Sequence, residues 1–275
     1  MTRKIYNIYR SEAAAFDEAL DELLAAAIGA DETVVRIVLF GAPKDNEEYA
    51  TQRAAIEERC KEYFGSHSPM VAYVAQAPLR CTLAAEVTAV PREQAEKIRW
   101  HEDYITLDGE VLSAGIYAPL DKNIAEQAEL IFARVAEILK AEGVTTADIV
   151  RQWNYIEQIT SMHGGRQNYQ EFNDARTKYY SKRAWSNGYP AATGIGASGE
   201  GIIVGGIAFK KAEQNAKGIY PIDNPLQVAA HVYSKRVLID DDINAMKSTP
   251  KFERAKLIES SRGACCFVSG TAAIR

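Results

Sequence analysis

The chain has 275 residues and a mass of 30.3 kDa, which is enough for two domains or one large one. Its 32 Lys and Arg against 37 Asp and Glu give a net charge of −5. This balance argues against a general nucleic-acid-binding protein, which usually carries a basic excess. No stretch approaches the ~18 consecutive apolar residues of a membrane-spanning helix, and residues 1–6 do not begin a signal peptide. The sequence predicts a cytoplasmic protein with neither a membrane nor a nucleic acid as partner.

Cysteine and histidine are scattered along the chain, with 4 of each. Cys265 and Cys266 are neighbours, but no Cys-x-x-Cys pair, His-x-x-x-His pair or His-Glu-x-x-His motif occurs. This usage is typical of reduced thiols in the cytoplasm, and the spacing does not favour a zinc site. We expect no metal and no cofactor.

The first part of the chain alternates strand and helix signals. Ser11 is a candidate N-cap of the first helix, and Gly65 follows the end of the second. Pro91 opens a short segment, through Trp100, that is expected to form a helical turn. The expected strands are residues 5–9, 34–40, 70–74 and 82–90, and the expected helices are residues 12–28 and 46–64.

A second unit begins near Tyr104, where Asp108-Gly109 predicts a hairpin between strands 104–107 and 111–117. An amphipathic helix capped by Asn123 follows. Its apolar residues, at spacings of four and three, are Ile124, Ala128, Ile131, Val135 and Ile138. Further elements are expected as a helix at 168–180 and strands at 149–159, 201–209, 226–233 and 263–271. The order predicts an α+β fold, with helices on one face of a mixed sheet.

Gly194-Ile-Gly196-Ala-Ser-Gly199 matches the form G-x-G-x-x-G of dinucleotide sites. The context excludes such a site, because a strand must precede the glycines and a helix must follow. Here Tyr189-Pro190 precedes them and the strand 201–209 follows. Two interpretations stay open: a flexible turn, and a backbone that a small ligand approaches closely because glycine has no Cβ.

Two regions carry arginines that are candidates for binding a carboxylate. Arg151 shares one face of a predicted strand with Trp153 and Tyr155. The structural alternative is a packed sheet face on which the arginine reaches toward solvent. Arg254, with Arg262 further on, could hold a carboxylate bidentately, and the alternative is a solvated surface arginine.

Tyr169, Phe172 and Arg176 fall at spacings of three and four on the predicted helix 168–180, and therefore lie on one face of it. This face is either a binding surface or an aromatic core stripe that ends in an arginine.

Four runs taken together resemble the signature runs of chorismatases, which are two-domain enzymes of the Rid/YjgF (endoribonuclease L-PSP-like) superfamily. The runs are Arg151-Gln-Trp-Asn-Tyr-Ile156, Tyr169-Gln-Glu-Phe-Asn-Asp-Ala-Arg176, Pro190-Ala-Ala-Thr-Gly-Ile-Gly196 and Phe267-Val-Ser-Gly-Thr-Ala-Ala-Ile274. The resemblance implies two Rid/YjgF-like units, each a mixed β-sheet with helices packed on one face. The first, divergent unit is expected at residues 1–110 and the chorismatase-type unit at residues 111–275.

The resemblance implies a substrate. Chorismatases hydrolyse chorismate to pyruvate and a dihydroxycyclohexadiene carboxylate or a hydroxybenzoate. By this resemblance the arginines clamp carboxylates, Tyr169 contacts the ring or a carboxylate, and the backbone of residues 193–196 approaches the substrate. The implied substrate-binding residues are Arg151, Tyr169, Arg176, Gly194, Gly196, Arg254 and Thr271. The acid glutamate of the family is expected shortly after the run Gly270–Ala273, which places it beyond Arg275.

Alternatives to the enzyme stay open. Ala192 stands where Rid imine deaminases carry an arginine after Pro-Ala, which argues against imine deaminase chemistry. A non-catalytic Rid-like protein that binds a small carboxylate is the second hypothesis. Members of the superfamily are often named endoribonuclease or translation initiation inhibitor. The net charge of −5 does not favour an RNA substrate for this chain. Single-domain Rid proteins are trimers, so both a monomer and a small homo-oligomer, such as a trimer, stay open.

Overall fold

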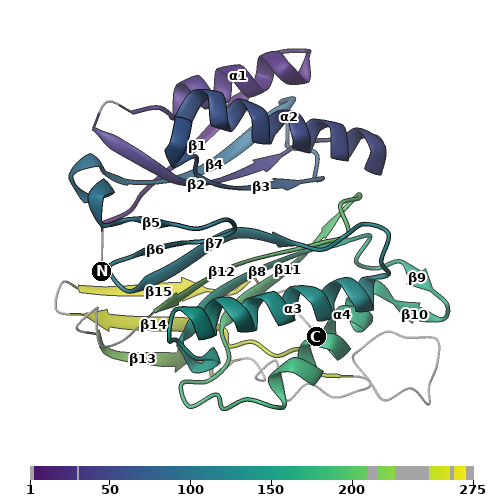
Figure 1. The fold of residues 1–275 in the computed structure, drawn as a ribbon. Helices are drawn as coiled ribbons and strands as arrows, with labels where there is room; N and C mark the ends of the chain where they lie inside the picture. Colours follow the sequence, from purple (N-terminus) through teal and green to yellow (C-terminus); the bar gives the residue numbers. More distant parts are fainter. Residues whose placement is uncertain (1–2, 30, 210–215, 227–247, 261–262, 271–275) are drawn as a thin grey trace. The chain divides into compact units, whose positions relative to one another are not determined.

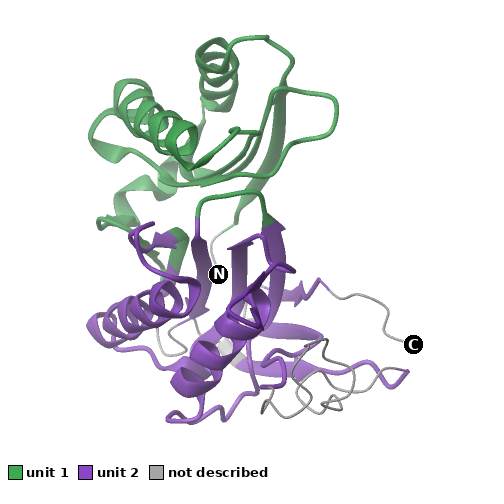
Figure 2. Cartoon of the chain, turned by 90° about the vertical axis from the view of Figure 1, so that its right-hand side faces the viewer, with its two compact units in different colours: residues 1–108, 112–115, 197–200 green, residues 109–111, 116–196, 201–275 purple. Residues whose placement is uncertain are grey.

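The structure is a computed structural model, and it describes residues 3–29, 31–209, 216–226, 248–260 and 263–270. The chain divides into two compact units, which Figure 2 colours green and purple. The first contains residues 1–108, 112–115 and 197–200, and the second contains residues 109–111, 116–196 and 201–275. Strand β7 (Glu110–Tyr117) contributes to both, so the division at 110/111 stays a prediction.

The first unit is a sheet of strand order β1-β4-β2-β3 with helices α1 and α2 on one face (Figure 1). β2 pairs parallel with β3 and antiparallel with β4, so this sheet is mixed as predicted. Its helices are α1 (Phe16–Ala27) and α2 (Asn46–Phe64), followed by the 3-10 helices η1 (Gly65–His67) and η2 (Arg92–Lys97). The strands are β1 (Ile5–Ser11), β2 (Glu32–Phe40), β3 (Met70–Val74), β4 (Leu83–Pro91), β5 (Arg99–Trp100) and β6 (Ile105–Leu107).

The core of the first unit lies between this sheet and its helices. Leu20, Leu23 and Leu24 of α1 are buried against Ile37 of β2 and Ile56 of α2. Their spacing of one and three residues puts the leucines on one side of the helix. Burying such side chains contributes roughly 1.5–3 kcal/mol each, which fixes the helices on this face.

The second unit contains two long helices that lie side by side on one face of its larger sheet (Figure 1). Within the second unit that sheet has the strand order β11-β8-β12-β7, and a smaller sheet has the order β13-β14-β15. The helices are α3 (Ile124–Ala141) and α4 (Asn168–Tyr180), with the 3-10 helix η3 (Thr146–Asp148). The further strands are β8 (Ile149–Glu157), β9 (Met162–His163), β10 (Arg166–Gln167), β11 (Ala191–Ala197), β12 (Ile202–Phe209), β13 (Ala216–Ile222), β14 (Ala255–Ser260) and β15 (Gly263–Val268).

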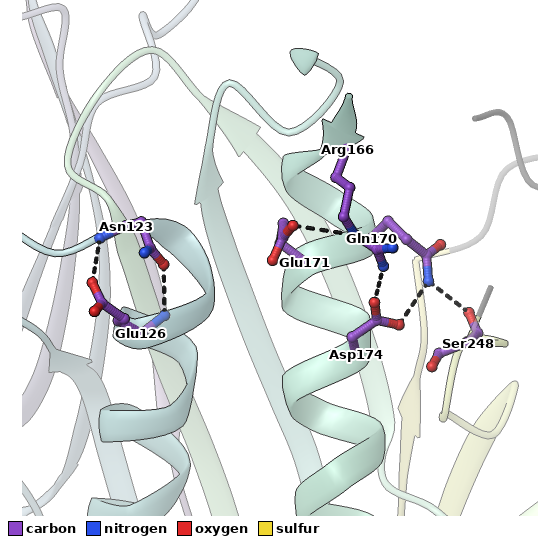
Figure 3. Close-up of polar contacts among 7 residues, drawn as sticks. All are labelled: Asn123, Glu126, Arg166, Gln170, Glu171, Asp174 and Ser248. Carbon is purple, nitrogen blue, oxygen red and sulfur yellow. Dashed lines mark hydrogen bonds and ion pairs between the residues drawn. The ribbon is translucent and has the colours of Figure 1, made fainter. Parts of the chain in front are cut away.

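Aromatic packing joins the two helices of the second unit. The ring of Phe132 on α3 lies 5.6 Å from Phe172 and 5.1 Å from Tyr179, both on α4. The start of α3 is fixed by a capping box, in which Asn123 accepts from the Glu126 N–H and Glu126 accepts from the Asn123 N–H (Figure 3). The α+β expectation, with helices on one face of the sheet, is therefore confirmed.

The predicted N-cap at Ser11 is wrong. β1 pairs with β4 through the position Ser11↔Leu83, and α1 begins only at Phe16, with Ala15 at its N-cap. The Ser11 hydroxyl instead donates to Glu22 at 2.5 Å and accepts from the Ala13 N–H. The backbone up to Ser11 pairs with β4 as a strand, so the helix begins after this residue.

The interpretation of the glycine run as a flexible turn is also wrong, because Ala191–Ala197 forms strand β11 beside β8. Local composition disfavours a strand here, but β8 supplies the pairing partner. Strands β13 and β14 were not predicted. The strand expected at 226–233 lies outside the described residues except for Leu226, which is in a turn.

Candidate functional site

The side chain of Thr193 links two strands and the segment after β15. Its Oγ1 accepts a hydrogen bond of 2.6 Å from Arg151 Nη2 and one of 3.1 Å from the N–H of Gly270. Asn154 Nδ2 donates to the Thr193 carbonyl at 3.1 Å. Because β8 and β11 are neighbours in the sheet, Arg151 and Asn154 of β8 reach Thr193 of β11 directly. We call Arg151, Thr193 and Gly270 the threonine node.

Arg254 is tied to the same segment through Ser269. The N–H of Ser269 donates to the Arg254 carbonyl at 2.8 Å, and Ser269 Oγ donates to the Glu253 carbonyl at 2.5 Å. The same Oγ accepts from the Ala192 N–H at 2.8 Å. Three hydrogen bonds of Ser269 therefore hold the backbone of Arg254 beside β11.

Both arginines of this region are buried. Arg151 and Arg254 are each 8% exposed, so the surface alternative for Arg254 is wrong. The Arg151 guanidinium carbon lies 4.8 Å from the Trp153 ring, and that of Arg254 lies 5.7 Å from the Phe252 ring. Guanidinium groups bind carboxylates through paired, charge-assisted hydrogen bonds, so these two positions suit an anionic ligand.

The glycines of β11 are covered by side chains of the same chain. A Cβ on Gly194 would lie 3.5 Å from Tyr169 Cε2, and one on Gly196 would lie 2.7 Å from Ile159 Cγ2. Glycine is needed at 196 because a larger residue would collide with Ile159. The groups that approach these glycines closely are therefore the side chains of Tyr169 and Ile159.

Arg176 lies on α4 and is 3% exposed. Its Nη2 donates to Asn173 Oδ1, and its guanidinium carbon lies 5.3 Å from the Phe172 ring. Lys251 is near enough that burial, and then the charge of Arg176, lower the pKa of its ammonium group. The predicted helix 168–180 is confirmed, and Arg176 is buried with the aromatic stripe.

The sheet separates the predicted residues into two groups. Successive side chains of a strand point to opposite faces. Tyr180 of α4 donates to Gln152 at 2.6 Å, so the face with Gln152 is the one that α4 covers and Arg151 points to the other. On β11, Thr193 likewise shares the face of Arg151, and Gly194 shares that of Tyr169.

Two of the candidate positions lie outside the described residues: Thr271 and Arg262. Within the described ranges, no three His, Cys, Asp or Glu side chains are grouped so that they could hold a metal ion. No helix in the same ranges is long and apolar enough to span a membrane.

Sequence reasoning missed the side chains of Thr193, Ser269 and Lys251. Thr193 stands in the glycine run and Ser269 in the last signature run, so the resemblance pointed to their segments but not to their hydroxyls. The contacts that reveal them join residues 42 and 77 positions apart, which periodicity cannot show.

A pocket in the first unit is lined by Ile8, Arg10, Phe40, Leu79 and further neighbours. None of the predicted site residues lies there, and its lining is mostly apolar.

Comparison with known proteins finds similarity to chorismatases. A family model described as Chorismatase FkbO/Hyg5-like, N-terminal, matches residues 85–208. A 3-hydroxybenzoate synthase of Streptomyces hygroscopicus is 31% identical over 188 residues, covering 66% of this chain and 51% of that protein. The chain is chorismatase-like.

A solved chorismatase structure has a similar fold. A crystal structure of a chorismatase superposes with a TM-score of 0.67 at 19% identity, covering 99% of this chorismatase-like chain and 70% of that chain. At this identity the likeness shows the fold alone. The YjgF-family protein Rv2704 of Mycobacterium tuberculosis matches 40% of this chain and 86% of its own, with a TM-score of 0.32 and 17% identity. The chain spans about half the length of the curated relative that it matches.

Proposed function

We propose that this chorismatase-like chain binds chorismate or a related enol-pyruvyl carboxylate, and that the protein hydrolyses it to pyruvate and a cyclohexadiene or hydroxybenzoate acid. The observation that carries the proposal is the threonine node, which holds buried Arg151 beside the segment of buried Arg254. The likeness to a 3-hydroxybenzoate synthase and to a chorismatase supports this substrate class.

The chemistry of the substrate explains why two arginines are useful. Chorismate carries two carboxylates and an enol ether, and guanidinium groups bind carboxylates through paired, charge-assisted hydrogen bonds. We assign Arg151 and Arg254 to the carboxylates. Because Thr193 and Ser269 hold their strands in place, the two cations are positioned before the substrate binds, which lowers the entropic cost of orienting it.

The proposed reaction consumes one water when the product is the dihydroxycyclohexadiene acid. A hydroxybenzoate forms when that ring alcohol then loses one water, so that no water is consumed overall. A proton adds to the terminal methylene carbon of the enol ether, and the water oxygen bonds to the resulting oxocarbenium carbon. The hemiketal then breaks its C–O bond to the ring, with return of a proton, and gives pyruvate and the ring alcohol. The residues proposed here bind and orient the substrate, and the proton donor is not among them.

Tyr169, Gly194 and Gly196 are proposed to act through β11. They lie on the face of β11 opposite Thr193, where Tyr169 and Ile159 pack over the two glycines. In this proposal, their close packing fixes the position of β11 against α4, and hence the position of Thr193 on the other face of the strand. Thr271 stays a proposed substrate-binding residue because it follows Gly270 of the threonine node.

The test is incubation of chorismate with the protein, with pyruvate measured by coupling to lactate dehydrogenase. The same assay is run on the protein extended by any residues that follow Arg275 in the natural reading frame. We expect pyruvate release that Arg254→Met abolishes and Arg254→Lys partly keeps. If chorismate raises the melting temperature without any pyruvate release, the second hypothesis, a carboxylate-binding protein without activity, is the correct one.

Location and assembly are part of the proposal. We propose a cytoplasmic protein, which is supported by four free cysteines, with vicinal Cys265 and Cys266 among them. A monomer or a small homo-oligomer such as a trimer fits the superfamily. Size-exclusion chromatography with light scattering measures which one forms.

A further inference from the structure

Helix α4 carries a buried polar stripe on the side that faces residues 248–251. Gln170, Asn173, Arg176 and Thr177 recur at spacings of three and four, so they lie on one side of the helix. Gln170 is 3%, Asn173 0% and Arg176 3% exposed. Gln170 Nε2 donates to the Ser248 carbonyl at 3.4 Å, which brings this segment against α4 (Figure 3).

Several donors of this stripe have no partner. Asn173 Nδ2, Arg176 Nε and Thr177 Oγ1 are buried and make no hydrogen bond to any of the described residues. Buried polar groups are nearly always paired, so three orphans in one stripe need an explanation. The carboxylates of the same helix do not supply it, because Glu171 and Asp174 are ion-paired with Arg166 (Figure 3).

A second cation adjoins the stripe. Lys251 is half-buried and its Nζ donates to Thr249 Oγ1 at 2.7 Å. Burial and the nearby Arg176 charge lower the pKa of its ammonium group. The positive charges of buried Arg176 and half-buried Lys251 repel each other, and an anion bound between them removes that repulsion.

We propose that Asn173, Arg176 and Lys251 form a second anion site, on the α4 face of β11, which binds a small monocarboxylate. One carboxylate oxygen accepts from Arg176 Nε and the other from Asn173 Nδ2, with Lys251 supplying the second positive charge. Thr177 Oγ1 is the remaining polar group of the site.

The donor set favours a carboxylate over phosphate. Its members carry two positive charges, and the site is closed to solvent at Asn173 and Arg176. Taking a doubly charged phosphate out of water costs far more than taking out a singly charged carboxylate.

The site is distinct from the threonine node. Arg151 and Thr193 lie on the other face of the sheet, so a single small molecule cannot contact both groups across the strands. The proposal therefore does not rest on the proposed function. It assigns Arg176 to a different ligand from the one held by Arg151 and Arg254.

The test compares the melting temperature in sodium acetate and in sodium chloride at equal ionic strength. At acetate concentrations about ten times the dissociation constant, we expect a rise of about 2–4 °C for the unsubstituted chain. Lys251→Met should remove most of this rise, and its own melting temperature in chloride should be unchanged or higher. Lys178→Met is the matched control: Lys178 is exposed on the same helix and pairs with Glu129, so this variant should keep the full rise.

A second measurement, on the unsubstituted protein, tests the proposal if Lys251→Met folds poorly. The lysines are reductively methylated with ¹³C, and the resonance of Lys251 is titrated with pH in chloride and in acetate. We expect its pKa to lie below the ordinary value for lysine in chloride and to rise in acetate. An unchanged pKa, or an acetate-dependent melting shift that survives Lys251→Met in full, would overturn the proposal. Failure to release pyruvate from chorismate would leave it standing, since that assay concerns the other face.

Discussion

The hydroxyl of Thr193 accepts a 2.6 Å hydrogen bond from Arg151 Nη2, across the neighbouring strands β8 and β11. The same oxygen also accepts from the Gly270 N–H. One hydroxyl thereby fixes a buried guanidinium and the start of the segment that follows β15. The proposed carboxylate site includes this link, because it joins Arg151 to the segment that follows Arg254 and β15.

Thr193→Val removes the acceptor while keeping the shape of the side chain. We expect the free energy of unfolding to fall by about 1–3 kcal/mol, because the buried Arg151 donor and the Gly270 N–H lose their partner. We also expect chorismate to bind at least about tenfold more weakly, which is about 1.4 kcal/mol. Urea denaturation and calorimetric titration measure the two effects.

Thr193→Ser is the control, because it keeps Oγ and loses only a methyl group. It should retain most of the affinity for chorismate. Should the folded Thr193→Val variant bind chorismate as tightly as the unsubstituted chain, Thr193 does not position the site.

The capping box of α3 makes a prediction about stability alone. Asn123→Ala leaves the Glu126 N–H without its acceptor, and should cost about 0.5–2 kcal/mol in the free energy of unfolding. Asn123→Asp keeps an acceptor at the helix N-terminus and should stay close to the unsubstituted value. Equal stability of the alanine and aspartate variants in urea denaturation would contradict the role of this cap.

The cysteines should differ strongly in reactivity. Cys60 is buried in the core of the first unit, and burial, with a smaller effect of Glu57, raises the pKa of its thiol to about 12. Because the thiolate is the reactive form and this pKa lies above the ordinary value, Cys60 stays protonated throughout the range from pH 7 to 9. Exposed Cys266 should react with iodoacetamide at pH 8.

Mass spectrometry of labelled peptides measures this difference. Labelling of Cys60 should appear only in denaturant, while Cys266 is labelled in the native protein. Equal native rates at the two positions would show that the first unit opens freely.

The sequence predicted the helices well where local signals agreed. Residues 168–180 and 46–64 form α4 and α2 with the expected bounds, and Gly65 takes a positive φ of 63° at the end of α2. For α2, Gly65 and the helical composition point to the same boundary, so local signals were sufficient there.

Non-local contacts explain what the sequence could not predict. Strand β11 contains glycines that disfavour a strand, and it forms because β8 pairs with it and Tyr169 and Ile159 cover it. The division of the candidate residues between two sheet faces has the same origin. The sequence placed Arg151 on a strand and Arg176 on a helix, but it did not show that the two arginines lie on opposite faces of the sheet.

The central claim is that this chorismatase-like protein hydrolyses chorismate with Arg151 and Arg254 as carboxylate ligands. The most direct test is the rate of pyruvate release from chorismate by the protein expressed from its natural reading frame, compared with its Arg254→Met variant. We predict one pyruvate per chorismate consumed, and a loss of about 100-fold or more in kcat/KM for the variant, which is about 2.7 kcal/mol. An unchanged rate in a folded Arg254→Met protein, or no pyruvate from the unsubstituted protein, would contradict the claim.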